Sequence, residues 1–330
     1  MWTGANGNRK YVDPDVRSLM DRTGGLLDPY AVVRICVASL LERLHQFDGQ
    51  FENAFERICA IASLAGFTVK PFRGDRGALK GHEAIIVPSN NGDTKGTIFY
   101  NPELPLPRII FSIGHEITHS FFPASSTGAR FRSLSKNGSK GARELEMLCH
   151  AGASELTMPL SEFTAAVKRH GFGLGSVDLI RRSFETSFEA STYRMAQTAS
   201  LRAAAGLFQF RLRVGEADSA RSVNLPLFPK TRINLEAPTK KYRRQSFHPS
   251  PSFPSDLVLP WNKSVPETSH IYLAAETKAF QCGFETIPVN GRGRDIRCYL
   301  EAIPAPYQAE GADPDHPDIL CLLTVTSTKT

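Results

Sequence analysis

The chain has 330 residues, of which 41% are hydrophobic and 22% charged, and its formal net charge is +6. These proportions exclude a disordered chain and allow two or three domains with buried cores. Its six cysteines show no short paired spacing, which indicates a reducing compartment rather than a disulfide-stapled secreted protein. There is no apolar leader near the start and no run of about 18 apolar residues, so the sequence predicts a cytoplasmic protein that does not span a membrane.

The first half of the chain is expected to alternate helices with one pair of strands. After a polar arm, apolar residues at helical spacing predict helices over residues 31–44 and 50–65. The runs at 83–88 and 96–100, separated by an Asn-Asn-Gly-Asp cluster, predict a β-hairpin. A further apolar helix is expected over residues 108–122.

The second half changes from helical to strand-like patterns. Helices are predicted over residues 142–156 and 162–170, and two short helices between 176 and 205 could form a helix-turn-helix-like pair. From Leu207 onward, alternating runs such as FQFRLRV and ILCLLTV predict strands, with most of the prolines around them. This change of pattern indicates a separate β-rich domain.

One segment of the helix predicted over residues 108–122 carries metal-binding chemistry. His115 and His119 are four residues apart, so their imidazoles share one helical face, and Glu116 follows the first histidine. Catalytic zinc sites use three protein ligands and leave a fourth position open. Because the helix is apolar, burying two histidines and a glutamate without partners would be costly, and a metal removes that cost. We therefore interpret His115 and His119 as ligands of Zn²⁺.

The helix predicted over residues 142–156 offers three candidates for the third ligand: Glu144, Glu146 and Glu155. Glu146 is favoured because it lies in the apolar row of that helix. His150, one turn further on, suits either a side chain that hydrogen-bonds a ligand or a histidine of the core. The neighbouring Cys149 is interpreted as a small buried hydrophobic residue rather than a nucleophile or a sulfur ligand.

Two motifs follow one another in this region, GHEITHSFF at residues 114–122 and RELEMLCHAGASELTMP at residues 143–159. In this order they resemble the ImmA/IrrE family of bacterial metallopeptidases. The resemblance covers about residues 51–205, and the later run FETSFEASTYRMAQT is similar to a Ser-x-x-Ala-x-x-x-Arg helix of that family. The chain departs from the family in having no preceding DNA-binding helix-turn-helix, and at His150, where a small polar residue is common.

The resemblance implies a function for each matched residue. It makes His115, His119 and Glu146 the zinc ligands and Glu116 the general base. Some members of the family carry a GAF-like sensor after the peptidase, so the resemblance also implies a regulatory domain at the C-terminal end of this chain.

We therefore expect an α+β fold whose core is a zincin-like metallopeptidase, built of helices with a small β-sheet. The predicted division is an N-terminal arm and helix (1–48), a zinc metallopeptidase domain (49–170), a helical, helix-turn-helix-like segment (171–205) and a β-rich C-terminal domain (206–330).

The expected mechanism is that of an open zinc site. Such a site makes hydroxide available at neutral pH and polarises the scissile carbonyl. Glu116 is expected to take a proton from water and pass it to the leaving amine. The oxyanion also needs a hydrogen-bond donor, for which Tyr193, Arg194 and His150 are candidates. Tyr193 and Arg194 equally suit core and surface positions of their helix.

The leading hypothesis is a zinc-dependent endopeptidase that cleaves one intracellular regulatory protein, such as a transcriptional repressor or an antitoxin-like partner, in bacterial stress or defence regulation. The family resemblance implies this substrate class. The alternative is a non-proteolytic zinc-containing regulator that binds DNA or a protein partner through the helical pair and the basic tract 230–244. Glu116 favours the peptidase, because a structural zinc site needs no base. A general aminopeptidase is a third hypothesis, but no pocket for a substrate amine is recognisable in the sequence.

Overall fold

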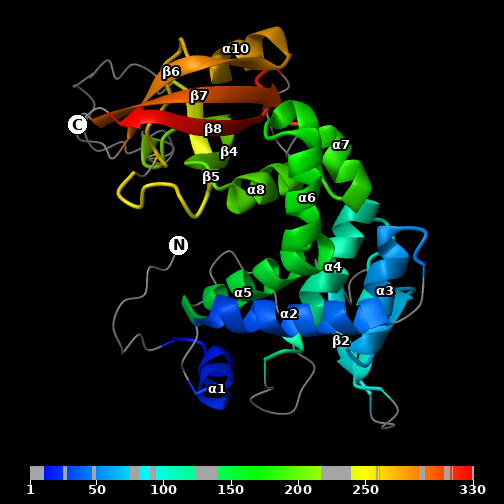
Figure 1. The fold of residues 1–330 in the computed structure, drawn as a ribbon. Helices are drawn as coiled ribbons and strands as arrows, with labels where there is room; N and C mark the ends of the chain where they lie inside the picture. Colours follow the sequence, from blue (N-terminus) through cyan, green and yellow to red (C-terminus); the bar gives the residue numbers. More distant parts are fainter. Residues whose placement is uncertain are drawn as a thin grey trace, which may run out of the picture. The chain divides into compact units, whose positions relative to one another are not determined.

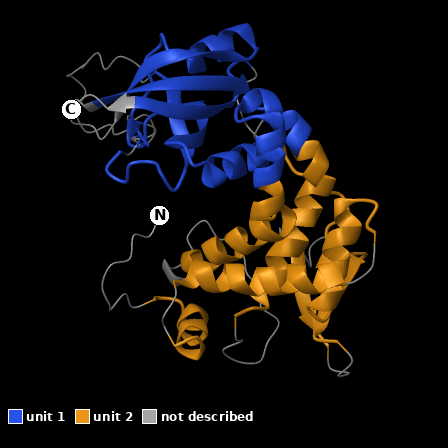
Figure 2. Cartoon of the chain, in the orientation of Figure 1, with its two compact units in different colours: residues 1, 164–180, 188–330 blue, residues 2–163, 181–187 orange. Residues whose placement is uncertain are grey.

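The computed structural model describes residues 11–24, 28–46, 50–74, 82–89, 94–122, 140–216, 239–257, 259, 261–289, 294–307, 313 and 315–328. The chain divides into two compact units, coloured separately in Figure 2. The N-terminal unit comprises Trp2–Phe163 and Arg181–Ser187, and the C-terminal unit comprises Thr164–Ile180 and Phe188–Thr330. Each unit has its own hydrophobic core.

The N-terminal unit combines helices with a small three-stranded sheet (Figure 1). Its helices are α1 (Pro14–Arg22), α2 (Pro29–Gln46), α3 (Ala54–Leu64), α4 (Leu106–His119), α5 (Lys140–Thr157) and the start of α6 (Leu160–His170). Its strands are β1 (Phe67–Pro71), β2 (Ala84–Pro88) and β3 (Gly96–Tyr100), in the order β1-β3-β2. The combination of helices and sheet confirms the predicted α+β class.

The antiparallel pairing of β2 with β3 confirms the predicted hairpin strands, while the residues of its predicted turn lie outside the described part of the chain. The sequence did not lead us to expect β1, which pairs parallel to β3. Its pattern of buried Phe67, exposed Thr68 and exposed Lys70 has the alternation of a strand, but it is short and directly follows a helix. Since β3 has a partner on each side, β2 is left at an edge of the sheet.

Helix α4 lies in the core of the N-terminal unit and packs against α5. Ile110, Ile113 and Ile117 are buried at helical spacing, as the apolar pattern predicts. The crossing depends on Gly152 of α5, where an added Cβ would lie 2.6 Å from Oγ1 of Thr118 on α4 and 3.0 Å from Cγ1 of Val33 on α2. No side chain fits there, so α5 approaches α4 through its own backbone.

The C-terminal unit is built around a five-stranded antiparallel sheet in the order β5-β4-β8-β7-β6 (Figure 1). Its strands are β4 (Ala203–Arg211), β5 (Lys241–Pro249), β6 (Gln281–Val289), β7 (Arg294–Pro304) and β8 (Ile319–Thr328). Its further helices are α8 (Phe188–Thr198) and α10 (His270–Thr277), and α7 (Leu174–Phe184) begins in this unit.

The two helices α8 and α10 cover opposite faces of this sheet. Leu320 packs with Phe188 of α8, whereas the adjacent Cys321 belongs to the core that includes Ile271 of α10. Successive residues of a strand point to opposite faces, so these two clusters lie on the two sides of β8. The predicted β-rich C-terminal region is therefore a sheet with a helix on each face.

The compact units divide the chain differently from the predicted domains. Helix α2, assigned to the separate segment 1–48, shares the core of the N-terminal unit through Val33 and Val37. The predicted boundary between residues 205 and 206 falls within β4, which begins at Ala203. The three alanines that open β4 are fully buried, and alanine is a helix former, so the start of this strand resembled the end of a helix.

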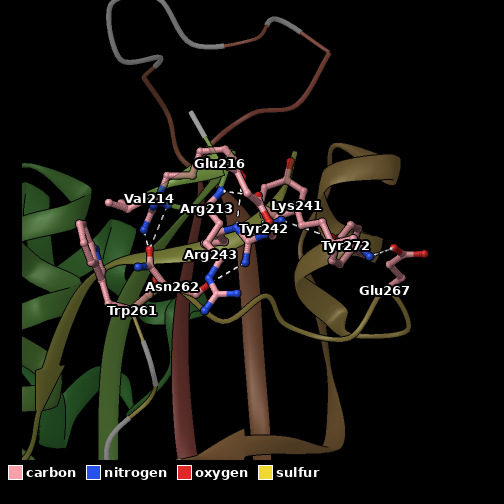
Figure 3. A network of polar contacts seen from close by, with 11 residues as sticks. Arg213, Val214, Glu216, Lys241, Tyr242, Arg243, Trp261, Asn262, Glu267 and Tyr272 are labelled. Carbon is pink, nitrogen blue, oxygen red and sulfur yellow. Dashed lines mark hydrogen bonds and ion pairs between the residues drawn. The ribbon is translucent and has the colours of Figure 1, made fainter. Parts of the chain in front are cut away.

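The edge strand β5 is joined to the segment around Trp261 and Asn262 by a network of arginines (Figure 3). A terminal nitrogen of Arg211 donates to the carbonyls of Arg244 and Trp261 at 3.1 Å, and the Arg211 guanidinium lies over the Trp261 ring. The buried Arg243 donates to the carbonyls of Arg211 and Asn262. This part of the basic tract thus supports the fold.

The lysines at the start of β5 have acidic partners in the same unit. Lys241 lies 3.0 Å from a carboxylate oxygen of Glu267, and Lys240 lies 3.7 Å from one of Asp313. Residues 230–238 of the basic tract lie outside the described residues. None of the helices in the described ranges combines the length and the apolar character needed to cross a membrane.

The close crossing of α4 and α5 leads to a first prediction. Gly152→Ala should lower the free energy of unfolding of the N-terminal unit by about 1–3 kcal/mol, because the new methyl group overpacks the crossing. Urea unfolding of the variant against the wild type measures the change. Gly175→Ala in α7 is the matched control: nothing lies within 4 Å of its added Cβ, so its stability should stay within about 1 kcal/mol of wild type. Equal stability of the two variants would contradict the packing argument.

Candidate metal centre

The histidines of α4 bring their ring nitrogens together on one face of the helix. The Nε2 atoms of His115 and His119 are 3.0 Å apart, and the two rings meet edge to face with their centroids 4.6 Å apart. Both side chains are largely buried, with exposed fractions of 15% and 11%. The helical spacing thus produces the convergent imidazole pair expected from the sequence.

Of the three glutamates considered on α5, Glu146 points toward this pair. Its Oε2 lies 3.1 Å from Nε2 of His115, and its Oε1 lies 3.6 Å from Nε2 of His119. Glu144 instead accepts hydrogen bonds from the backbone of Val12 and Asp13, and Glu155 accepts one from the backbone of Leu160. The structure therefore assembles His115, His119 and Glu146.

The spacing of these three groups fits a tetrahedral metal ion. Ligand atoms about 2.1 Å from such an ion lie about 3.4 Å from one another, and the observed separations of 3.0, 3.1 and 3.6 Å bracket that value. Two imidazole nitrogens and a carboxylate are also a donor set that divalent transition metals prefer. This group could therefore hold a metal ion.

Glu116 and His150 adjoin the same group. Ligand atoms of His115, Glu116 and His119 lie within 4.8 Å of one another, as do those of His115, Glu146 and His150. The His150 ring packs edge to face on His115, with centroids 4.9 Å apart, yet the residue stays exposed. Desolvation of the imidazole ring by the side chains packed around it, together with the nearby His115, lowers the pKa of His150.

A cavity of about 670 Å³ opens onto these residues. One wall is the edge strand β2, which contributes Ala84, Ile85, Ile86 and Pro88, and another is the polar face of α4. Aromatic side chains line the cavity, namely Phe67, Phe111 and Phe122. A largely apolar cleft with a few convergent polar groups is the usual form of a binding site.

Glu83 fixes the start of β2 to α4 at the edge of this cavity. Its Oε1 accepts hydrogen bonds from Arg108, and its Oε2 lies 2.7 Å from the hydroxyl of Ser112, which donates to it. Burial alone would raise the pKa of Glu83, but the hydrogen bonds from Arg108 and Ser112 outweigh it and hold the pKa below its usual value. The residue is therefore a carboxylate at neutral pH.

Sequence reasoning missed the roles of Glu83 and Ser112 in this wall. Arg108 and Ser112 precede His115 by seven and three residues, so they lie on the same face of α4. That spacing could have indicated the cluster, but its partner Glu83 comes from another element and could not be placed from local pattern. The burial of Cys149 was predicted correctly, whereas its contact with His119, described below, was not expected.

The residues of this site lie within a region that matches a known protein family. Residues 62–196 match the model of a peptidase family described as the IrrE N-terminal-like domain. Residues 62–196 form an IrrE N-terminal-like domain. This confirms the resemblance seen in the motifs. Among solved structures, 94% of this chain aligns with 80% of a Mycobacterium tuberculosis transcriptional regulator, at 12% sequence identity and a TM-score of 0.49. No curated protein matches the chain.

The IrrE N-terminal-like domain ends in α8, which carries the other two predicted oxyanion donors. The hydroxyl of Tyr193 lies 2.5 Å from a carboxylate oxygen of Glu189 and 2.6 Å from the hydroxyl of Ser246, and its ring stacks on His248. Burial and the adjacent Glu189 raise the pKa of Tyr193 far above its usual value. Arg194 is buried in the same helix. The contacts of Tyr193 thus hold α8 to the sheet, and catalytic roles for both residues stay predictions.

The Glu83–Arg108 pair of this domain should make a small, pH-dependent contribution to stability. Because the Arg108 side chain is 61% exposed, the coupling near neutral pH should be at most about 1 kcal/mol. The pKa of Glu83 is lowered on folding, so the contribution is present above the unfolded value of about 4.3 and is lost as the pH falls through the lowered folded value. A double-mutant cycle of Glu83→Gln and Arg108→Gln, by urea unfolding at about pH 7 and about pH 3, measures it. An equal coupling energy at both pH values would count against the ion pair.

Proposed function

We propose that this chain is a zinc-dependent endopeptidase that cleaves a specific regulatory protein in the bacterial cytoplasm, such as a transcriptional repressor or an antitoxin-like partner. The observation that carries the proposal is the convergence of His115, His119 and Glu146, with Glu116 beside them, on a cavity bounded by an edge strand. The match to a peptidase family supports the same reaction class.

In this proposal His115 and His119 would hold the zinc ion through Nε2, and Glu146 would hold it through a carboxylate oxygen. Zinc in such a site supplies Lewis acidity toward water and toward a carbonyl oxygen. Three protein ligands leave a coordination position open for the reaction, whereas a structural zinc site would fill it with a fourth side chain. A site with three protein ligands therefore supports the peptidase, whereas a site with a fourth protein ligand would support the non-proteolytic zinc regulator.

Glu116 is the proposed general base. Its carboxylate lies within 4.8 Å of the histidine nitrogens and also lines the cavity, so it faces the space that the reacting water and the scissile bond would share. It takes a proton from the water and gives it to the leaving amine. Because Glu116 directly follows the proposed ligand His115 on α4, its carboxylate stays close to the proposed position of the metal.

His150 is the proposed donor to the oxyanion. It lines the same cavity as Glu116, and its pKa is lowered by desolvation and by the nearby His115, which favours the neutral ring with one N–H to donate. A neutral donor aimed at the developing negative charge stabilises the transition state of acyl transfer. Of the three candidates from the sequence, His150 is the one that the structure brings to the metal group.

The edge strand β2 is the proposed docking site for the substrate backbone. One side of β2 pairs with β3, and residues of β2 line the cavity. An extended peptide that adds to such an edge gains main-chain hydrogen bonds, while pockets for alternate side chains provide selectivity. This mode suits an endopeptidase, because it requires neither a free amino terminus nor a free carboxyl terminus.

The ligand set predicts the metal content of purified variants. Wild type should contain about one zinc per chain, and His115→Ala and Glu146→Gln should lose most of it, because removing one of three ligands leaves two. Glu116→Gln and His150→Ala should retain the metal, since neither residue is a ligand in this proposal. Elemental analysis after identical preparation measures these five proteins and His119→Ala, which should also lose most of its zinc. Loss of zinc in His150→Ala, with retention in His119→Ala, would instead support His115, Glu146 and His150 as the ligands.

Cleavage is tested by comparing new protein N-termini in bacterial cells that express wild type or Glu116→Gln. We expect one or a few N-termini that require Glu116, with a rate reduced about 10²–10³-fold in His150→Ala once the cleaved protein is purified. A zinc-loaded wild type that generates no N-termini beyond those of Glu116→Gln would overturn the peptidase and support the non-proteolytic regulator. Degradation of many short peptides would instead indicate a peptide scavenger.

A further inference from the structure

We infer that Cys149 is a positioning residue that orients His119 for the metal, an inference that rests on the proposed zinc site. Its Sγ lies 3.2 Å from Nδ1 of His119, on the opposite side of the ring from the Nε2 that faces His115 and Glu146. Cys149 is fully buried, and it follows Glu146 by three residues on α5. The thiol is thus behind the ring of one ligand, on the helix that supplies another.

A histidine binds a metal ion through a nitrogen that carries no proton. The neutral ring has one N–H, so a ligand that uses Nε2 must carry its proton on Nδ1 and donate it to an acceptor. Metal-binding histidines commonly have a carboxylate, a backbone carbonyl or a water as this partner. At His119 the sulfur of Cys149 stands at the acceptor position.

The direction of this hydrogen bond decides whether His119 can act as a ligand. If Nδ1–H donates to the sulfur, Nε2 keeps its lone pair for the metal. If the thiol donates to Nδ1, the ring proton occupies Nε2, between His115 and Glu146, and blocks coordination. A side chain that can only accept at this position would favour the metal-binding tautomer, and one with no polar atom would leave the N–H unsatisfied in a buried place.

The two histidine ligands differ in this respect. Nδ1 of His115 is buried and has no hydrogen-bond partner among the described residues. Among the described residues, Cys149 therefore fixes the orientation of the His119 ring through Nδ1, whereas no hydrogen bond to Nδ1 does so for the His115 ring. Because Glu146 and Cys149 share a face of α5, this helix places one ligand and orients another in a single packing arrangement.

The test uses three substitutions at one position and measures zinc affinity by competition with a chelator. Cys149→Ala and Cys149→Val remove the acceptor and should weaken zinc binding about 10- to 100-fold. Cys149→Ser keeps an acceptor and should stay within about threefold of wild type. Alanine is smaller than cysteine and valine is larger, so weakening in both variants reports the loss of the hydrogen bond rather than a change of packing in one direction.

A second measurement follows the ring itself. In ¹⁵N-histidine NMR spectra of the zinc-loaded protein, we expect His119 to carry its proton on Nδ1 and to exchange it slowly with solvent in wild type and Cys149→Ser. In Cys149→Val that proton should exchange faster. Urea unfolding of each variant in the presence of chelator establishes that its fold is intact.

The outcomes separate this inference from the proposed function. Zinc binding by Cys149→Val at wild-type affinity, or equal weakening in the folded serine and valine variants, would overturn the role of Cys149 and leave the zinc site intact. A wild type that binds no zinc would overturn the proposed function and this inference together.

Discussion

The close crossing of α4 and α5 is the constraint on which the candidate metal centre depends. Helix α4 supplies two imidazoles, and the candidate third ligand, Glu146, comes from α5. Gly152 makes that approach possible, since an added Cβ at this position would collide with Thr118. Gly114 continues the contact, because its added Cβ would touch Ala153 at 3.5 Å. Small residues at the crossing thus allow the two helices to approach closely enough for their candidate metal-binding side chains to converge.

Much of the site could be predicted because its main signals are local. The spacing of His115 and His119 determines their common face whatever the tertiary structure, and Glu116 adds a carboxylate at a fixed offset. The choice of Glu146 over Glu144 and Glu155 needed one further assumption, that the ligand lies on the apolar side of α5. The structure places Glu146 beside the histidines and gives the other two glutamates backbone partners.

The parts that could not be predicted depend on contacts between elements distant in sequence. Strand β1 is five residues long and gains its stability from pairing with β3, some thirty residues later. The short helix α10 lies within a region of strand-like runs, and it is marked by the Ser269 N-cap, which accepts from the backbone of Ile271. Glu83 likewise acquires its role only when β2 packs beside α4. Periodicity describes one element at a time, so it cannot supply these partners.

One face of α5 carries both the candidate ligand Glu146 and the residues that pack against α4. Metal binding would therefore be linked to the stability of the N-terminal unit. Glu146, Cys149 and Ala153 recur at helical spacing, with the buried Gly152 beside them at the crossing with α4. A metal held between α4 and α5 would stabilise that crossing, because an ion that binds the folded state shifts the folding equilibrium toward it. The core of the C-terminal unit contains none of the metal-centre residues. Metal supply would therefore act directly on the stability of the N-terminal unit. Substitutions along this face of α5 should also combine non-additively, since each changes the position of the same helix.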